Sequence, residues 1–178
     1  MQYKKLGRLH KAPLVSLFTS TFSESEGLAE GQALGRLSAE LADAIDEPDI
    51  CCFGACTGEA LVGAIFFSAL HFKNPISVYM LSPVAVGTAY QRQGIGHTLI
   101  EFGLNELRKR RVSVVVTYGD PAFYSTLAFS PLSEETLKAP MTLSMPEGWQ
   151  GLNLKGGEIA TVAGQPACAK PFQNSAYW

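Results

Sequence analysis

The stretch that begins at Ile76 constrains the fold most, because its apolar pattern changes from that of a strand to that of a helix across one loop. Ile76 to Val86 is an apolar run typical of a β-strand. From Ile95 onward, apolar residues recur on one face with polar residues opposite, which predicts an amphipathic helix. The loop between them contains Gly94 and Gly96. A strand that leads through such a loop into a helix is typical of an α/β domain.

The rest of the chain alternates between helix-like and strand-like patterns. Helices are expected at Pro13–Phe22, Leu28–Ile45 and Pro121–Leu127, the last with Asp120 as N-cap and Pro121 at its first position. Strands are expected at Gln2–Leu6, Ile50–Ala55, Leu61–Phe72, Val112–Thr117, Met141–Met145 and Ile159–Ala163. This order predicts an α/β fold with a mixed sheet and helices on both of its faces.

Length and composition favour one domain over residues 1–178, with 133–178 as a less regular extension. Apolar residues make up 47% of the chain, which excludes disorder through low hydrophobicity. With 14 Lys and Arg against 16 Asp and Glu, the chain lacks the basic surface that nonspecific nucleic-acid binding needs. No stretch has the pattern of a signal peptide or a membrane span, so we expect a cytoplasmic protein without a membrane or nucleic-acid partner.

The four cysteines are too few for a disulfide scaffold in a chain of this length. Cys51, Cys52 and Cys56 lie together, but no second Cys or His pair follows at zinc-like spacing. We therefore expect no metal, and interpret these residues as small buried strand residues with free thiols.

The loop around Gly94 and Gly96 has the outline of a phosphate-binding site. The first N–H groups of a helix have no intrahelical partner, and glycines let an anion approach them. The Walker motif would need a lysine after Gly96, where His97 stands, and the dinucleotide fingerprint would need a third glycine, where Leu99 stands. Neither motif matches, and a plain glycine-containing turn is the alternative.

At this loop the chain resembles the GCN5-related N-acetyltransferases. Their signature, Gln/Arg-x-x-Gly-x-Gly/Ala between the fourth strand and the third helix, is matched by residues 91–96. Their aromatic helix after the fifth strand is similar to Phe123–Phe129, with Ala128 in place of the usual glycine and Gly119-Asp120-Pro121 before it. The resemblance covers about residues 1 to 132 and implies a mixed, mostly antiparallel, twisted sheet.

In that family the fourth strand splays from the fifth, which offers a reason for Pro83 inside a predicted strand. The free backbone groups of such a strand bind the pantetheine arm of acetyl-CoA, and the following loop binds its pyrophosphate. The resemblance therefore implies acetyl-CoA as acyl donor. The residues implied to bind it are Val84, Ala85, Val86, Gln91, Arg92, Gln93, Gly94, Ile95, Gly96, His97 and Thr98.

Tyr124 is the candidate general acid. The leaving thiolate has a conjugate thiol of pKa about 8.5, and a tyrosine with a pKa of about 10 is a workable acid toward it. The alternative is an aromatic residue packed in the core. The family's geometry would place the developing oxyanion near the Val86 N–H.

The general base is less well defined. Neither Asn74–Tyr90 nor Val112–Tyr118 contains a carboxylate, and Asp120 is the nearest one. A capping role explains Asp120 equally well, and a water relay is another alternative. Glu24 and Glu26, in the turn expected between the first two helices, are candidate amine-attracting residues, or else solvated loop charges.

These features together predict an acetyl-CoA-dependent N-acetyltransferase that transfers an acetyl group to a primary amine by direct attack in a ternary complex. The acceptor would be a small molecule or a peptide. A non-catalytic acetyl-CoA sensor is the main alternative, and a longer acyl donor or an oxygen acceptor is another. The aromatic tail, Phe172, Tyr177 and Trp178, must pack on the domain or meet a partner, which leaves a homodimer open.

Overall fold

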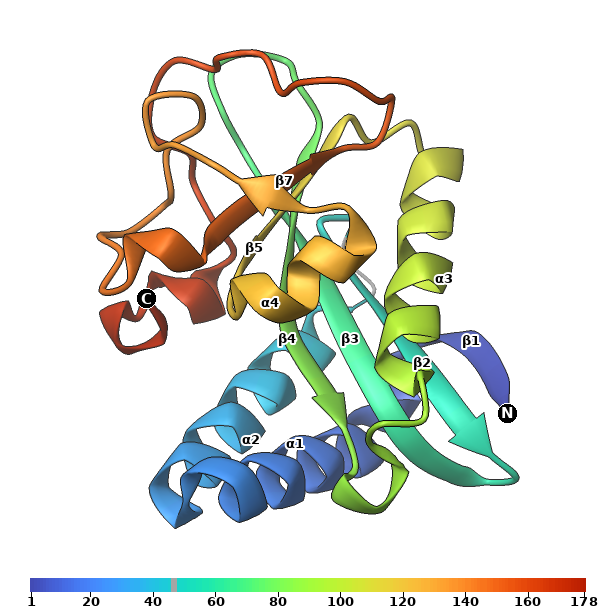
Figure 1. Cartoon of the computed structure of the whole chain (residues 1–178). Coiled ribbons are helices and arrows are strands. Elements are labelled where there is room, and N and C mark those ends of the chain that lie inside the picture. Colours follow the sequence, from blue (N-terminus) through green and yellow to red (C-terminus); the bar gives the residue numbers. More distant parts are fainter. Residues whose placement is uncertain (46–47) are drawn as a thin grey trace. The chain divides into compact units, whose positions relative to one another are not determined.

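A computed structural model describes residues 1–45 and 48–178 and shows a mixed α/β fold (Figure 1). The strands are β1 (Gln2–Leu6), β2 (Ile50–Thr57), β3 (Ala60–Leu70), β4 (Val78–Val86), β5 (Val114–Tyr118), β6 (Ser130–Pro131) and β7 (Trp149–Asn153). The α-helices are α1 (Lys11–Glu26), α2 (Leu28–Asp43), α3 (Ile95–Lys109) and α4 (Pro121–Tyr124). Short 3-10 turns lie at Arg8–His10, Thr88–Tyr90, Ser125–Leu127, Pro146–Gly148, Lys170–Gln173 and Ser175–Tyr177.

The strands form one sheet with the hydrogen-bonding order β1-β2-β3-β4-β5-β7-β6. β1 runs antiparallel to β2, and β7 runs antiparallel to both β5 and β6. β4 and β5 pair in parallel, in register from Val78 opposite Val114 to Leu81 opposite Thr117. The sheet is thus mixed and mostly antiparallel, which confirms the predicted fold class.

Contacts between residues divide the chain into two compact units. Unit 1 comprises Met1–Phe67 and Pro83–Gly103, and unit 2 comprises Ser68–Ser82 and Leu104–Trp178. The elements β3, β4 and α3 each contribute residues to both units.

In unit 1, helices cover both faces of the strands. Neighbouring residues of a strand point to opposite faces, so the side chains of Phe66 and Phe67 of β3 lie on opposite faces of the sheet. Phe66 lies 5.8 Å from Phe18 of α1, measured between ring centroids. On the other face, a Cβ atom at Gly103 of α3 would lie 2.5 Å from Phe67 Cε2, so the helix backbone lies directly on that ring. The predicted arrangement of helices on both faces is confirmed within this unit.

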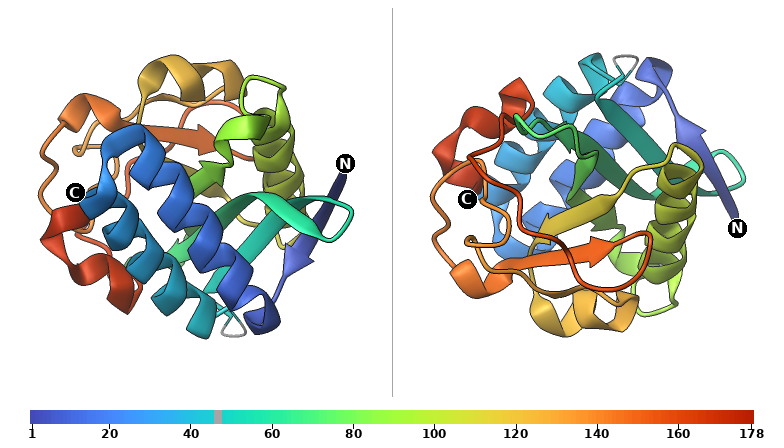
Figure 2. Two further views of the ribbon diagram at one scale, coloured as in Figure 1. Left: turned by 90° about the horizontal axis from the view of Figure 1, so that it is seen from below. Right: turned by 90° about the horizontal axis from the view of Figure 1, so that it is seen from above.

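The first two helices form an antiparallel pair, visible in the left view of Figure 2. Sequence reasoning ended the first helix at Phe22 and placed a turn from Ser23 to Gly27, and this was wrong. α1 continues to Glu26, and its Gly27 N–H donates to Ser23 O at 3.2 Å. The turn consists of Gly27 alone, whose φ of 101° is readily adopted only by glycine. Glu24 and Glu26 consequently lie on the last turn of a helix.

Unit 2 contains a strand that is buried except at its last residue, and a long irregular tail. Residues Val114 to Thr117 of β5 are at most 2% exposed. Phe172 and Trp178 from the tail are buried as well, so this part of the aromatic tail packs within the unit. Trp149 donates its indole N–H to Leu137 O at 2.9 Å, which links the start of β7 to the loop before it.

The two strands expected in the tail, Met141–Met145 and Ile159–Ala163, are not strands. The tail strand that pairs with β5 is instead Trp149–Asn153, a segment that was not among the expected strands. Gly151 is tolerated inside this strand because the side chains of Leu132 and Ile159 occupy the space that a Cβ atom would need. Glycine in a strand often marks such a close approach.

Cys51, Cys52 and Cys56 are buried on β2 with free thiols, as predicted. Within residues 1–45 and 48–178, no cluster of His, Cys, Asp and Glu side chains is arranged to hold a metal ion. None of the helices described in those ranges has the length and apolarity of a membrane span.

Candidate active site

The loop between β4 and α3 is fixed by its own glutamine side chains. Gln91 Nε2 donates to Val86 O at 2.9 Å, and Gln93 Nε2 donates to Ala89 O at 3.2 Å. Both bonds join the loop to the residues that leave β4. The first glutamine of the matched signature therefore stabilises the loop through its side chain.

Two residues of this loop have a left-handed backbone conformation. Arg92 and Gly94 both have positive φ, 59° and 78°, and left-handed residues of this kind turn successive N–H groups toward one side. A Cβ atom at Gly94 would meet nothing within 4 Å, so the space next to it is open. The loop leads straight into α3, whose first turn adds unpaired N–H groups and the positive end of a helix dipole. These features fit a diphosphate.

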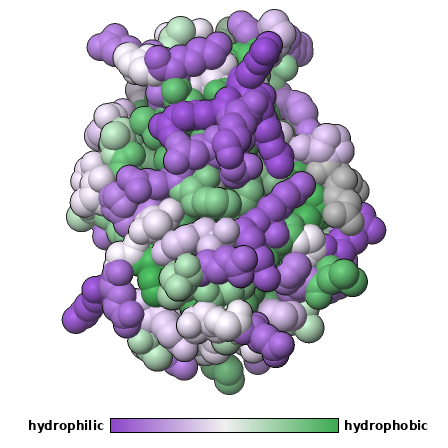
Figure 3. Space-filling view, turned by 90° about the vertical axis from the view of Figure 1, so that its right-hand side faces the viewer, coloured by the Kyte–Doolittle hydropathy of each residue, from purple (hydrophilic) through white to green (hydrophobic). Residues whose placement is uncertain are grey.

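Side chains of the first turn of α3 are engaged along the helix. Thr98 donates its hydroxyl to Gly94 O at 3.1 Å, and His97 Nδ1 lies 3.7 Å from Glu101 Oε1. The view turned toward α3 shows hydrophilic side chains over much of that face (Figure 3). Arg92 is the cationic side chain within the signature, and it is exposed.

The C-terminal part of β4 extends beyond its pairing with β5. The last parallel pair is Leu81 with Thr117, whereas β4 continues to Val86. Pro83 lies in this unpaired part, where the missing N–H costs no β4–β5 hydrogen bond. Val84 and Val86 are partly exposed and Ala85 is buried, as expected for alternating residues. The proline is therefore compatible with a strand because this part of β4 does not pair with β5, as the family resemblance implied.

Tyr124 lies at the end of the short helix α4, and its position follows from local interactions. Asp120 Oδ1 accepts the Ala122 N–H at 2.9 Å, and Pro121 occupies the first helical position, so the predicted cap is confirmed. The Tyr124 ring packs edge-on against Phe123 and Phe129, at centroid distances of 5.0 and 5.6 Å. It is 8% exposed.

The phenol of Tyr124 is held in its neutral form. Burial raises its pKa above the ordinary value, a hydrogen bond with the Thr117 side chain opposes this in part, and the charge of Asp120 raises it further. Thr117 is itself buried and donates its hydroxyl to Leu81 O at 3.0 Å. Since Leu81 and Thr117 are the last β4–β5 pair, the phenol lies where that ladder ends. A protonated phenol at this point can donate a hydrogen bond or a proton.

The predicted site residues fall into two groups. Val84–Val86 and the loop 91–98 belong to unit 1, as do Glu24 and Glu26, which are exposed at the end of α1. Asp120 and Tyr124 belong to unit 2. Asp120 is exposed and its carboxylate caps α4, which accounts for this residue without a role as base.

Sequence reasoning missed Thr117 and Gly119. Thr117 was interpreted only as one of a run of β-branched strand residues, and its hydrogen bonds depend on register with β4. Gly119 lies directly against Tyr124, because a Cβ atom there would be 2.8 Å from Tyr124 Cε2. Its position just before Asp120-Pro121 was the available signal, since a glycine before a helix cap often marks a close approach.

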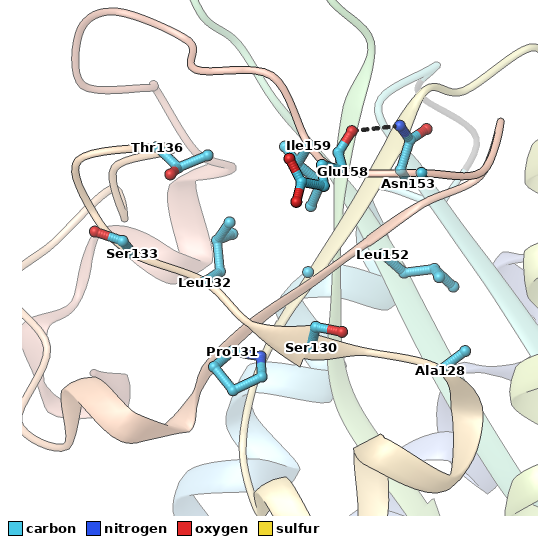
Figure 4. A pocket seen from close by; sticks show the side chains of 12 residues that line it. Ala128, Ser130, Pro131, Leu132, Ser133, Thr136, Leu152, Asn153, Glu158 and Ile159 are labelled. Carbon is cyan, nitrogen blue, oxygen red and sulfur yellow. Dashed lines mark hydrogen bonds between the residues drawn. The ribbon is translucent and has the colours of Figure 1, made fainter.

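Unit 2 also contains a half-open cavity of about 480 Å³ that none of the predicted site residues lines. Figure 4 shows Leu132 and Ile159 on its apolar part and Glu158 at its edge, where Asn153 Nδ2 donates to Glu158 O at 2.9 Å. Ala128 and Ser130 line this cavity, whereas Phe129 between them packs on Tyr124. The cavity therefore lies on the other side of this segment from the Tyr124 ring.

A family model described as the acetyltransferase (GNAT) family matches residues 13–129. The chain belongs to this family and is an acyltransferase. The match includes both the loop of residues 91–98 and the Tyr124 segment.

Individual relatives agree with this assignment. The chain is 28% identical over 143 residues to an uncharacterized N-acetyltransferase, YjhQ, of Escherichia coli K12, covering 76% of this chain and 77% of that protein. The crystal structure of the N-acetyltransferase YhbS from Escherichia coli in complex with CoA has a TM-score of 0.82 at 21% identity, covering 98% of this chain and 92% of the other. A GNAT acetyltransferase from Brucella melitensis in complex with acetyl-CoA has a TM-score of 0.71 at 22% identity, covering 96% and 97%. These structures confirm the fold.

Proposed function

We propose that this protein transfers the acetyl group of acetyl-CoA to a primary amine, with both reactants bound together. The observation that carries the proposal is the buried, protonated phenol of Tyr124 at the end of the β4–β5 ladder. A buried phenol is neutral before it donates its proton, and because burial raises its pKa it is a weaker acid toward the thiolate than a solvated tyrosine.

The acyl donor would be held mainly by backbone groups. The N–H groups of the loop 91–98, with positive φ at Arg92 and Gly94, would bind its pyrophosphate, and Val84 to Val86 would pair with its pantetheine arm. The CoA and acetyl-CoA complexes of the two structural relatives support this choice of ligand. Bound acetyl-CoA would supply an activated thioester.

In the transfer step, the amine nitrogen forms a bond to the thioester carbonyl carbon and the C–S bond breaks. Tyr124 donates its hydroxyl proton to the departing sulfur, and the Val86 N–H donates to the carbonyl oxygen as charge develops there. Asn74–Tyr90 and Val112–Tyr118 contain no carboxylate, and water is the proposed proton acceptor. Water takes one proton from the ammonium before the attack, and the second proton, lost as the amide forms, returns through water to the Tyr124 phenolate. Much of the rate enhancement would come from holding both reactants in one geometry.

The acceptor is proposed to be the cationic amine of a small molecule or a peptide. Glu24 and Glu26 support this class, since both carboxylates are exposed on the last turn of α1 and carry charge opposite to that of a protonated amine.

The test combines calorimetry with acetyl-CoA and a thiol-release assay over a panel of amines, including a polyamine, an aminoglycoside and a peptide. Tyr124→Phe should lower kcat by about 100-fold or more and leave acetyl-CoA affinity unchanged. Tyr3→Phe, which removes a hydroxyl from β1, is the matched control and should keep wild-type kcat.

An unchanged kcat in Tyr124→Phe would remove this residue from the mechanism. Binding of acetyl-CoA without turnover on any amine would instead favour a non-catalytic sensor, which the lack of a strand carboxylate also supports. Absence of binding would contradict both functions.

A further inference from the structure

The end of β5 is packed against the tail of the chain. Tyr118, the last residue of β5, lies nearly parallel to the indole of Trp178, with 6.1 Å between ring centroids and 22° between the ring planes. Trp178 is 7% exposed, and its indole N–H donates to Phe172 O at 2.8 Å. The indole also contacts the rings of Phe172 and Trp149, each at 6.4 Å. Trp178 is thus held in one orientation while it covers one face of Tyr118.

The hydroxyl of Tyr118 is bound at the opposite end of the same side chain. It accepts the Met145 N–H at 2.7 Å and lies 3.1 Å from Ser144 Oγ. Ring stacking and hydroxyl bonding together determine both the direction and the rotation of the Tyr118 side chain. Both sets of partners come from residues 144–178, for which the sequence indicated no role.

Gly119, the next residue, forms hydrogen bonds through both its N–H and its carbonyl group. Its N–H donates to Gly148 O at 3.0 Å, and its carbonyl accepts a hydrogen bond from Gln150 Nε2 at 3.3 Å. Gln150 is 1% exposed, so its side chain is held inside the unit while this bond is partly buried. The segment that leaves β5 therefore has a defined path before α4 begins.

This path determines where the Tyr124 ring lies. Tyr124 N donates to Asp120 O at 3.1 Å, and the Tyr124 ring lies directly on Gly119. A displacement of Tyr118 would move Gly119, and a displacement of Gly119 would move the ring that rests on it. All of these contacts lie within unit 2.

We propose that Trp178 is a positioning residue for Tyr124, acting through the stacked ring of Tyr118 and the backbone of Gly119. This inference rests on the proposed function, because it assigns a catalytic consequence to the placement of the Tyr124 hydroxyl. It gives the tail beyond residue 132 a role in the reaction in addition to its contribution to the core.

The experiment is a double-mutant cycle between Trp178→Ala and Tyr124→Phe, measured as kcat and as KM for acetyl-CoA. Trp178→Ala should lower kcat by about 10-fold or more and change the KM for acetyl-CoA by less than about twofold, since a small misplacement of a catalytic group slows chemistry. In the Tyr124→Phe background the same change should lower kcat no further, because the group that Trp178 positions is already absent. Trp178→Phe, which keeps an aromatic ring on Tyr118, should restore most of the activity.

A purely structural role predicts a different result. Leu6→Ala removes a buried side chain from β1 in unit 1 and is a control for general destabilisation, with wild-type kcat for the folded fraction. If Trp178→Ala lowers kcat equally in both backgrounds, the positioning role is wrong. If Trp178→Ala does not fold, the cycle is run with Trp178→Leu and Tyr118→Leu, to which the same criterion applies.

A second readout separates this inference from the proposed function. The Cζ resonance of Tyr124 in 13C-tyrosine-labelled protein, assigned by its loss in Tyr124→Phe, should titrate at lower pH in Trp178→Ala than in the wild type as the ring gains contact with water. If Tyr124→Phe has wild-type kcat but the Tyr124 resonance of Trp178→Ala still titrates at lower pH than that of the wild type, the acid assignment fails and the positioning contact stands. If the resonance titrates at the same pH in Trp178→Ala and in the wild type, the positioning role is wrong.

Discussion

The loop of residues 91–98 and the segment of residues 117–124 are built in opposite ways. The loop is held by hydrogen bonds to residues next to it in the sequence, as from Gln91 to Val86 and from Gln93 to Ala89. The Tyr124 segment is held by distant residues, since Gly119 bonds to Gly148 and Tyr118 stacks on Trp178.

The difference follows from what each segment is proposed to bind or donate. A diphosphate is bound by a backbone conformation, which a short stretch can adopt by itself. A neutral phenol has to be buried and oriented, and burial requires partners from elsewhere in the chain. The loop should therefore respond to changes within its own residues, whereas Tyr124 should respond to changes far away in sequence.

The largest effect is expected inside the loop. Gly96→Leu should weaken acetyl-CoA binding by more than about 100-fold, because a side chain would cover the N–H groups of the first turn of α3. Calorimetry measures the affinity. Gly7→Leu is the control, since a Cβ atom at Gly7 meets nothing within 4 Å, and it should bind normally. Normal binding by a folded Gly96→Leu protein would show that the diphosphate site is elsewhere.

A smaller effect is expected from the glycine that contacts Tyr124. Gly119→Ala adds a Cβ atom 2.8 Å from Tyr124 Cε2, so the ring must shift. We expect kcat to fall by about 10-fold to 100-fold with an unchanged Kd for acetyl-CoA, measured by steady-state kinetics and calorimetry. A change in Kd with constant kcat would reverse the proposed division of roles between the two segments.

The buried phenol should also make stability depend on alkaline pH. An unfolded tyrosine ionises with a pKa of about 10, and the folded pKa of Tyr124 is raised. Above pH 10 the unfolded chain releases a proton that the folded chain keeps, so stability falls as the pH rises toward the folded pKa, by up to about 1.4 kcal/mol per pH unit. Urea unfolding at pH 9 and pH 11 should show a smaller loss for Tyr124→Phe than for the wild type. Equal losses would contradict the buried, neutral phenol.

The smallest effect concerns the residue that differs from the family pattern. Ala128 has a φ of 64°, a left-handed conformation that costs an L-residue about 1 kcal/mol relative to glycine. Ala128→Gly should therefore raise the free energy of unfolding by about 0.5–1 kcal/mol, as measured by urea unfolding. Ala122→Gly, inside α4, is the matched control and should lower it. A loss of stability in Ala128→Gly would show that the alanine side chain makes a compensating contact.

The parts of the fold that sequence reasoning predicted correctly are those with local signals. The helix beginning at Ile95 follows from periodicity, and the cap at Asp120 follows from a capping residue. The errors occur where a local signal has two meanings. Trp149–Asn153 was not expected to be a strand, yet β7 contains Gly151 and follows Gly148, and neighbouring side chains pack against both glycines.

The candidate site shows the same division. The matched signature at residues 91–96 identified the loop, and positive φ at Arg92 and Gly94 agrees with its predicted role. Thr117 could not have been chosen among the β-branched residues around it, since its bond to Leu81 O depends on the β4–β5 register. Trp178 could be predicted to pack, but its stacking partner could not.

By itself, the sequence determined the family, the element order up to α4, the position of the signature loop and the choice of Tyr124 as a candidate, because each depends on residues close together in the chain. Only the tertiary structure decided which strand of the tail pairs with β5, what buries the Tyr124 phenol and what orients the segment before it. Those features depend on side chains separated by many residues, such as Tyr118 and Trp178, which meet only when the chain has folded.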